Sequence, residues 1–243
     1  MPPVLSRAIA LVLVGATVLI GACGDDLLIP PKRSDQQLSV LAAGGNEQSG
    51  TVGQPLAGAL LTRVIDQNGV PASGEKVAFV LLGDAPGSVV PDTVVTNADG
   101  AAACRWILGR GAGQQRIEAR LVVPSTAGGT AAVQYTATAG PGSATTLARI
   151  AGDNQSAAPG SLLPDSLVVG ITDQYGNPVP GIPVAWRVER GGGTISASSV
   201  TTGAAGRAAV TWSVGFSLGT QRVSAAVAGL AGSPATFDGQ AGF

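Results

Sequence analysis

The chain repeats itself, and this repeat constrains the fold more than any other feature. Asp66–Pro71 (DQNGVP) returns as Asp173–Pro178 (DQYGNP) after 107 residues, and segment 100–113 returns as 206–219 after 106 residues. Two unrelated segments that keep one spacing to within a single residue indicate one domain template used in tandem. A length of 243 residues holds about two such domains, at roughly 100–150 residues each.

Within each copy, apolar residues recur at every second position, which is the period of a β-strand with one buried face. Glycine turns separate these runs, and after residue 22 no segment has helical periodicity with caps. The pattern predicts an all-β chain of tandem β-sandwiches. The matched runs are Leu60, Thr62 and Val64 with Leu167, Val169 and Ile171; Val77–Leu81 with Val184–Val188; Ala102, Cys104, Trp106 and Leu108 with Ala208, Val210, Trp212 and Val214; and Ile117, Ala119 and Leu121 with Val223, Ala225 and Val227.

Two motifs are present in both copies, and they resemble the bacterial immunoglobulin-like domain of group 1, the invasin and intimin type. The first motif is Asp-x-x-Gly-x-Pro-x-x-Gly followed by Val-x-Phe, and the second is Thr-x-x-x-Gly-x-Ala. Trp186 stands where the family has phenylalanine, and Ala205 stands where the first copy has Asp99. The matching residues are Asp66, Gly69, Pro71, Gly74, Val77, Phe79, Thr96, Gly100 and Ala102, then Asp173, Gly176, Pro178, Gly181, Val184, Trp186, Thr202, Gly206 and Ala208.

This resemblance implies two tandem immunoglobulin-like β-sandwiches, at residues 38–140 and 145–243. Members of the family are structural and adhesive modules, often strung as stalks on bacterial surfaces, and the modules themselves are not catalytic. The junction Gly140–Ser143 is short, and we expect it to limit the freedom between the domains. In each motif we expect the aspartate (Asp66, Asp173) to accept backbone hydrogen bonds and the next glycine (Gly69, Gly176) to supply positive φ.

The first 22 residues predict a secretory signal peptide. Arg7 precedes an apolar run, Ala8–Ile20, of about 13 residues, which is too short for a bilayer that needs roughly 20. The next residues complete the run Ile20-Gly21-Ala22-Cys23, which resembles the lipobox of bacterial lipoproteins, with isoleucine where the lipobox favours leucine. The resemblance implies that Cys23 is the lipidated first residue and that 23–37 is a tether. An ordinary signal peptide that contains a cysteine is the alternative.

Charge and histidine content exclude several classes of function. Loss of residues 1–22 would remove Arg7 alone from the charged residues, leaving 13 basic and 15 acidic residues and no basic block for nucleic acid. The chain has no histidine, which removes the commonest general base, Ser-His-Asp triads and most zinc sites. Paired carboxylates could still act as acid and base, but the aspartates that align between the copies belong to the turn motif. We therefore expect no enzyme and no cofactor.

Cys104 could be a nucleophile or half of a disulfide. Its counterpart in the second copy is Val210, and the only other cysteine, Cys23, is expected to be acylated. A buried free thiol that packs as a small apolar group is therefore the favoured interpretation. Gly109–Gly113 resembles a phosphate-binding loop, but it opens no helix and lacks the P-loop lysine, so it is predicted to be a hairpin connection.

Calcium could bind at turns that offer oxygen ligands, either Asn97 with Asp99 or Asp66 with Asn68. The spacing lacks a dense Asp-x-Asp-x-Asp pattern, and Asp99 is not kept in the second copy. Turn stabilisation is the favoured interpretation, and we expect no metal site.

Two functional hypotheses remain. The first is a lipid-anchored stalk on the bacterial envelope, at the outer membrane, that acts in adhesion, spacing or surface interaction with a protein or glycan partner. Gly24 after Cys23 supports the outer membrane, because aspartate at that position retains enteric lipoproteins at the inner membrane. The second is a carbohydrate-binding or accessory module of polysaccharide uptake, which would need exposed aromatic residues. All three tryptophans fall on inward faces, which leaves Tyr135, Tyr175 and Phe216 as candidates.

Overall fold

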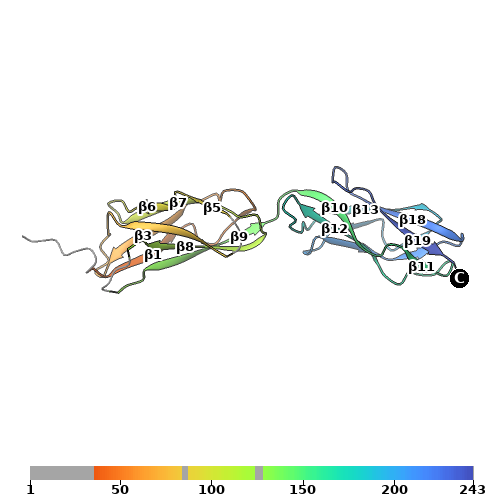
Figure 1. Cartoon of the computed structure of the whole chain (residues 1–243), viewed down its shortest axis with the longest axis horizontal. Helices are drawn as coiled ribbons and strands as arrows, with labels where there is room; N and C mark the ends of the chain where they lie inside the picture. The colour runs from red at the N-terminus through yellow and green to blue at the C-terminus, as the bar shows by residue number, and fades with distance from the viewer. Residues whose placement is uncertain (1–35, 84–86, 124–127, 243) are drawn as a thin grey trace, which may run out of the picture. The chain divides into compact units, whose positions relative to one another are not determined.

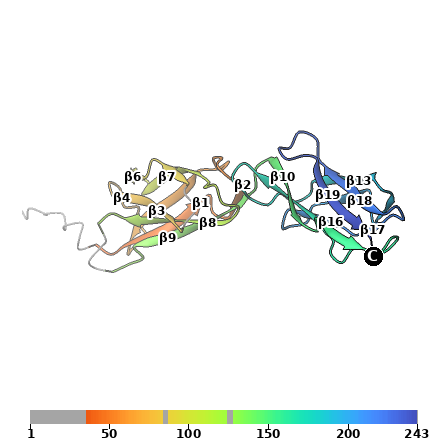
Figure 2. The same cartoon turned by 45° about the vertical axis from the view of Figure 1, so that its right-hand side comes forward.

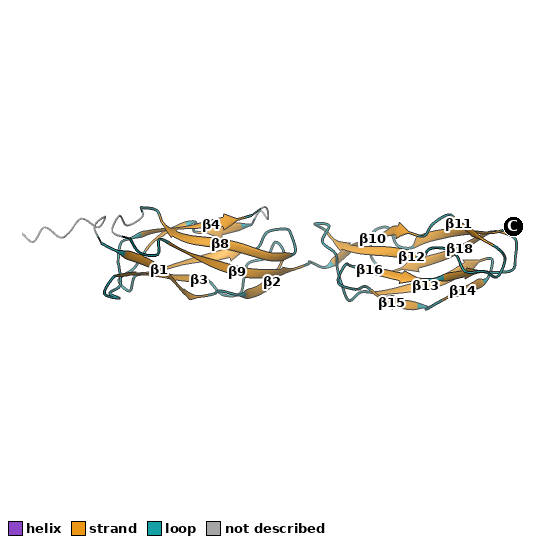
Figure 3. Ribbon diagram, turned by 90° about the horizontal axis from the view of Figure 1, so that it is seen from below, coloured by secondary structure: helices purple, strands orange, loops and turns teal. Residues whose placement is uncertain are grey.

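The computed structural model describes residues 36–83, 87–123 and 128–242, and these residues form one compact unit. They contain strands and loops and no helix (Figure 3). The all-β prediction is therefore confirmed. The predicted signal peptide, Cys23 and nearly all of the tether lie outside the described residues, and the predicted domain boundaries stay predictions.

Strands β1–β9 form the first sandwich (Figure 1). One sheet has the strand order β1-β3-β7-β5, and the other has the order β2-β9-β8-β4-β6. The strands are β1 Leu38–Gly44, β2 Gln48–Thr51, β3 Leu60–Asp66, β4 Lys76–Leu82, β5 Ser88–Val90, β6 Thr93–Val95, β7 Ala101–Ile107, β8 Gly113–Leu121 and β9 Ala132–Gly140.

Strands β10–β19 form the second sandwich with the same plan, and Figure 2 labels several of them from another side. The five-stranded sheet has the order β11-β19-β18-β13-β15, and the facing layer consists of β10-β12-β16 and the pair β14-β17. Here β16 and β17 together take the place of β7. The strands are β10 Ala144–Ala151, β11 Gln155–Ala157, β12 Leu167–Asp173, β13 Pro183–Arg190, β14 Gly193–Ile195, β15 Ser199–Thr201, β16 Arg207–Val210, β17 Trp212–Val214, β18 Gly219–Ala226 and β19 Ala235–Ala241.

The first strand segment of each sandwich changes sheets. β1 pairs antiparallel with β3, and the chain then crosses to β2, which pairs parallel with β9. The side chain of Gln48 holds this crossing, because its amide nitrogen donates to the Gly45 carbonyl at 2.7 Å and its oxygen accepts from the Gly58 N–H at 2.7 Å. Gln155 makes the same two contacts with Gly152 and Asp165. The crossing is thus built identically in both sandwiches.

Each sandwich has its own apolar core. Most residues predicted to face inward are buried, while Leu81, Val188 and Val227 are partly buried and pack against the cores. The four large aromatic residues among them (Phe79, Trp106, Trp186 and Trp212) are at most 3% exposed. Two further aromatic residues, Tyr135 and Phe237, are fully buried at matching positions of β9 and β19. They add aromatic volume to two cores otherwise built largely from valine, leucine and alanine.

The Asp-x-x-Gly turns have the predicted structure. The Asp66 carboxylate accepts from the N–H of Asn68 at 2.8 Å and of Val70 at 2.9 Å. Asp173 does the same at 2.8 and 2.9 Å in the second turn. The glycines that follow have φ of 78° and 84°, a backbone conformation that costs glycine nothing.

The threonine of the second motif fastens this turn region to the strand beside it. The Thr96 hydroxyl donates to the Ala72 carbonyl at 2.7 Å and accepts from the Glu75 N–H at 2.9 Å. Thr202 makes the equivalent bonds, at 2.8 and 3.0 Å, to the backbone at Val179 and Ile182. Both threonines are buried, and these bonds satisfy backbone groups that are at least partly shielded from water.

The loop Gly109–Gly113 is not a hairpin, and that prediction was wrong. β7 and β8 belong to different sheets, so the loop carries the chain from one layer to the other. The side chain of Gln115 takes the place of strand pairing: its oxygen accepts from the Gly109 N–H at 2.7 Å, and its nitrogen donates to the Gly111 carbonyl at 2.8 Å. Gln221 holds the loop 215–219 in the same way, through Gly215 and Ser217.

Replacement of Gln221 by alanine should therefore destabilise the second sandwich. The substitution leaves the buried Gly215 N–H without its acceptor and opens a void, at a cost of about 2–3 kcal/mol. For a domain of this size that corresponds to a fall in melting temperature of roughly 10 °C, measurable by calorimetry of the full chain. Gln134→Ala, at an exposed position of β9, is the matched control. Equal melting temperatures for Gln221→Ala and the control would contradict the role of Gln221.

Candidate functional site

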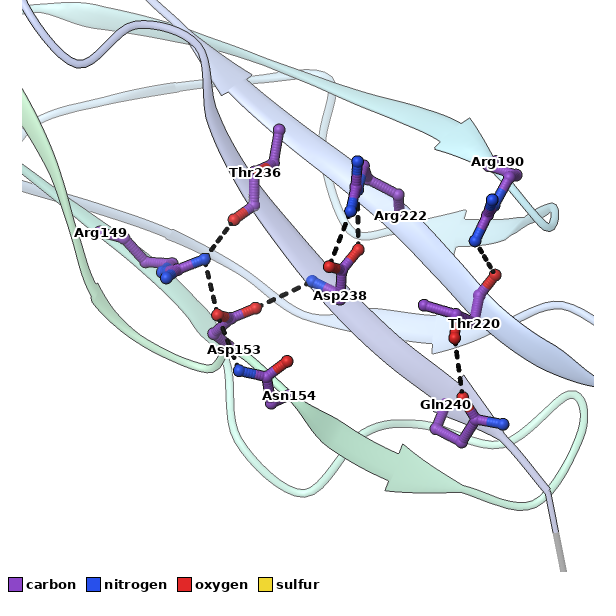
Figure 4. Close-up of polar contacts among 9 residues, drawn as sticks. All are labelled: Arg149, Asp153, Asn154, Arg190, Thr220, Arg222, Thr236, Asp238 and Gln240. Carbon is purple, nitrogen blue, oxygen red and sulfur yellow. Dashed lines mark hydrogen bonds and ion pairs between the residues drawn. The ribbon is translucent and has the colours of Figure 1, made fainter.

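One difference between the two sandwiches is a group of charged residues on the second one, here called the charged face: Arg149, Asp153, Arg190, Arg222 and Asp238 (Figure 4). Strand register gives their counterparts in the first sandwich. Four of the five counterparts are uncharged, which indicates that the fold does not require the charges. In the same order, the counterparts are Ala42, Asn46, Leu82, Arg116 and Thr136.

Arg222 and Asp238 form the centre of the charged face. They lie directly opposite each other on β18 and β19. The guanidinium and the carboxylate make two parallel contacts, Nε to Oδ1 at 2.7 Å and Nη2 to Oδ2 at 2.8 Å (Figure 4). This two-point geometry fixes both side chains and leaves their outer edges exposed to solvent.

A second ion pair extends the network to the loop after β10. Arg149 contacts the Asp153 carboxylate at 2.6 Å and donates to the Thr236 carbonyl at 2.7 Å. The other oxygen of Asp153 accepts from the backbone N–H of Asp238 at 2.9 Å. In the first sandwich Asn46 makes the same backbone contact with Thr136 at 2.8 Å. The backbone contact therefore belongs to the fold, and the second sandwich adds the charge.

The charges keep Asp238 ionised. The hydrogen bond from Arg222 lowers the pKa of the Asp238 carboxyl, partial burial opposes this, and the charges of Arg222, Arg190 and Arg149 lower it further. A carboxyl with a lowered pKa is a poor proton donor at neutral pH. The face can therefore recognise a partner by charge and hydrogen bonding, and it is poorly suited to acid catalysis.

An open hollow of about 340 Å³ lies beside the pair. It is lined by Asn154, Gln155, Ser156, Thr220, Asp238, Gly239 and Gln240, of which all but Gly239 have polar side chains. These groups donate and accept hydrogen bonds, and among them only Asp238 titrates near neutral or acidic pH. The hollow could bind a polar group, and it contains no nucleophile paired with a base.

A second difference between the copies lies where the two sandwiches meet. The Asn177 side chain donates to the Arg110 carbonyl at 2.7 Å and accepts from the Ala112 N–H at 2.8 Å. The Arg110 guanidinium lies 5.6 Å from the centre of the Tyr175 ring. The loop 109–113 of the first sandwich thus contacts the Asp-x-x-Gly turn of the second.

Asp173 stabilises this contact through hydrogen bonds to Asn177 and to the junction. Its carboxylate accepts from the Asn177 side chain at 2.9 Å and from the Gly142 N–H in the junction at 2.8 Å. Burial acts to raise the pKa of Asp173, but hydrogen bonds from Asn177, Gly142 and Tyr175 outweigh it and lower the pKa. The ionised carboxylate therefore links Gly142 of the junction to the Asp-x-x-Gly turn by hydrogen bonds.

The remaining candidates have structural roles. Cys104 is a free, buried thiol, as predicted, and burial raises its pKa to about 12, so it is not a nucleophile at neutral pH. Asn97 uses its side-chain oxygen to accept from the N–H groups of Asp99 and Ala101. No group of three or more Cys, Asp or Glu in the described part of the chain could hold a metal ion.

Tyr135 was wrong as a candidate for glycan binding. It is fully buried, and its hydroxyl donates to the Leu61 carbonyl at 2.6 Å and lies 2.8 Å from the Thr62 hydroxyl. Its alternating strand position next to Ala137 could have placed it in the core. Tyr175 lies at the contact between the sandwiches, and Phe216 is exposed. Within residues 36–83, 87–123 and 128–242, no helix has the length and apolar character of a membrane span.

Residues 164–238 match the sequence model of the bacterial Ig-like domain (group 1). The second sandwich is a group 1 bacterial Ig-like domain. The first sandwich has the same two motifs and the same strand plan, so the chain carries two Ig-like β-sandwiches. No curated protein matches the chain.

Solved structures with a similar arrangement include three adhesins. FdeC, an Escherichia coli adhesin, has 22% identity and a TM-score of 0.47, with 86% of this chain and 65% of that chain covered. InvE, a Yersinia pseudotuberculosis adhesin, has 16% identity and a TM-score of 0.37, with 87% of this chain and 60% of that chain covered. Invasin, a bacterial integrin-binding protein, has 18% identity and a TM-score of 0.38, with 85% of this chain and 39% of that chain covered. The chain thus spans less than two thirds of each of these structures.

The lowered pKa of Asp173 predicts a specific acid sensitivity. Because the folded pKa lies below the unfolded one, the carboxylate stabilises the fold above about pH 4, and this stability is lost as pH falls through the folded pKa. Asp173→Asn should lower the free energy of unfolding at pH 7. On acidification the variant should lose less of this free energy than the parent. Chemical denaturation of the full chain at pH 7 and pH 3 measures this, with the neutral neighbour change Gln174→Asn as control. An equal acid-induced loss in Asp173→Asn and the parent would contradict the linkage.

Proposed function

We infer that the chain is a non-catalytic, lipid-anchored envelope protein whose tandem Ig-like domains act in adhesion or surface interaction. The observation that carries this is the difference between the two copies. The motif residues that both copies keep are turn, fastening and core residues, whereas the charged face is specific to the second domain. Variation over a constant framework is typical of modules that present a binding surface.

A catalytic role has no support in the described residues. The thiol of Cys104 is buried, and the turn aspartates that both copies share are bound to backbone N–H groups. Asp153 and Asp238 are each paired with an arginine at 2.6–2.7 Å. The acidic groups therefore act in structure or recognition.

The charged face is the surface that we assign to the partner. It combines fixed arginine and aspartate groups with a neighbouring hollow of amides and hydroxyls, which suits a polar protein surface or a glycan. Arg190 lies at its edge, where it donates to the Thr220 carbonyl at 3.0 Å. Because exposed ionic contacts are screened by salt, partner binding should weaken as ionic strength rises.

Removal of two arginines should test the assignment. Cells that express the full chain with Arg190→Ala and Arg222→Ala should adhere about tenfold less than the parent to a panel of immobilised proteins and polysaccharides, because charged anchors carry much of such binding. The matched control removes two arginines from the first domain, Arg116→Ala and Arg120→Ala, on the strand that corresponds to β18. Equal adhesion of the two variants, whether reduced or unchanged, would overturn the assignment of the charged face.

The lipid anchor has a separate test. Cys23→Ser should release the protein from membranes or block its processing, because serine cannot take the thioether-linked lipid. Fractionation and labelling with a fatty-acid analogue measure the two outcomes, and Cys104→Ser is the matched cysteine control. Continued acyl labelling of the Cys23→Ser variant would contradict the anchor.

A further inference from the structure

The loop 215–219 at the end of the second domain exposes apolar side chains. Phe216 is 86% exposed and Leu218 is 68% exposed, and Leu162 beside the neighbouring strand is 57% exposed. Next to Phe216 lies an open hollow of about 420 Å³ whose walls are largely glycine and serine. The loop 215–219, with the exposed side chains of Phe216 and Leu218, is here called the end loop. Exposed phenylalanine and leucine two positions apart on one loop commonly mark an interaction site.

The first domain shows what covers the same loop. By the 106-residue repeat, Phe216 and Leu218 correspond to Arg110 and Ala112. Those two residues contact Asn177 in the turn of the next domain, through the Arg110 carbonyl and the Ala112 N–H. In the first domain the loop is thus a docking element for the Asp-x-x-Gly turn of the next domain.

An aromatic ring lies over the same glycine in both domains. A Cβ on Gly53 would lie 2.9 Å from the Tyr175 hydroxyl, so the ring of the next domain covers this glycine. A Cβ on Gly160, the counterpart of Gly53, would lie 2.7 Å from the Phe216 ring. In the inner contact the turn supplies the ring, whereas in the end loop the loop itself supplies it.

The turn of the first domain is complementary to this arrangement. It has Asn68 in place of Tyr175 and Val70 in place of Asn177. It therefore supplies neither an aromatic ring nor the side-chain amide that Asn177 uses to bind the loop. Val70 is 55% exposed, while Asn177 is 9% exposed. The end loop already has its own ring, Phe216, and an exposed leucine, Leu218. A turn that exposes valine and has no ring can therefore pack against it.

We propose that the end loop of one copy receives the Asp66–Val70 turn of a second copy, with Val70 packed against Phe216 and Leu218. The contact joins two different surfaces, so it links copies head to tail. Its apolar area comes from only a few side chains, well below the roughly 800 Å² per partner of a stable complex. The contact is therefore weak in dilute solution and is favoured as the concentration of the protein rises.

Site-specific disulfides test this proposal. Two tagged forms of the full chain, both with Cys104→Val, carry Val70→Cys in one and Leu218→Cys in the other, and are expressed together and oxidised on cells. The disulfide between copies, measured on non-reducing gels and by mass spectrometry, should form about tenfold more than with Val95→Cys in place of Val70→Cys. Val95 is the matched control because it is also a valine that is 55% exposed. Phe216→Arg, the residue of the first domain, should lower the yield about tenfold.

The inner contact provides the positive control. Ala112→Cys with Asn177→Cys should form a disulfide within one copy, because the Ala112 N–H donates to the Asn177 side-chain oxygen at 2.8 Å and the two residues are therefore neighbours. If this pair forms while the Val70→Cys pair gives no more product than the Val95→Cys pair, the proposal is overturned. A Val70→Cys yield that Phe216→Arg leaves unchanged would also overturn it.

Discussion

Both Ig-like domains depend on buried side chains that hydrogen-bond the backbone where the chain leaves one sheet for the other. Gln115 and Gln221 hold the loops between the layers, and Thr96 and Thr202 fasten the turn regions. A backbone group that is buried without a partner costs about as much as several buried methylenes contribute. Since valine, leucine and alanine make up most of each core, these polar contacts set which loops the sandwich can have.

The sequence predicted the parts of the fold that local chemistry determines. Alternation placed Trp106 and Trp212 in the cores, and the Asp-x-x-Gly pattern predicted the turns, because one carboxylate and one positive φ define such a turn. Gln115 and Gln221 were missed, because a glutamine in an alternating strand is usually exposed, and only the sheet topology shows that its target is the loop. The hairpin prediction failed for the same reason, and Tyr135 was misplaced because its hydroxyl finds partners inside the core.

The candidate site follows from comparing the copies after the fold is known. Asn46 and Asp153 both accept from the facing strand, so the fold needs an oxygen there and not a charge. The sequence alone could not separate these two requirements, because an aspartate in a turn is common in either role. With the backbone contact assigned to the fold, the ion pairs of Arg149 and Arg222 are left for recognition or for local rigidity. The adhesion of the paired-arginine variants distinguishes these two roles.

The same comparison explains how one domain template can have two kinds of end. The inner contact places a ring, a guanidinium and an asparagine between loop and turn, with the ring on the turn side. In the end loop the ring is on the loop side, and the Asp66–Val70 turn offers Val70. An end loop that met a turn with a tyrosine at the position of Tyr175 would bring two rings to one glycine. The position of one aromatic ring therefore distinguishes the contact inside a chain from a contact between chains, although the backbone is the same at both.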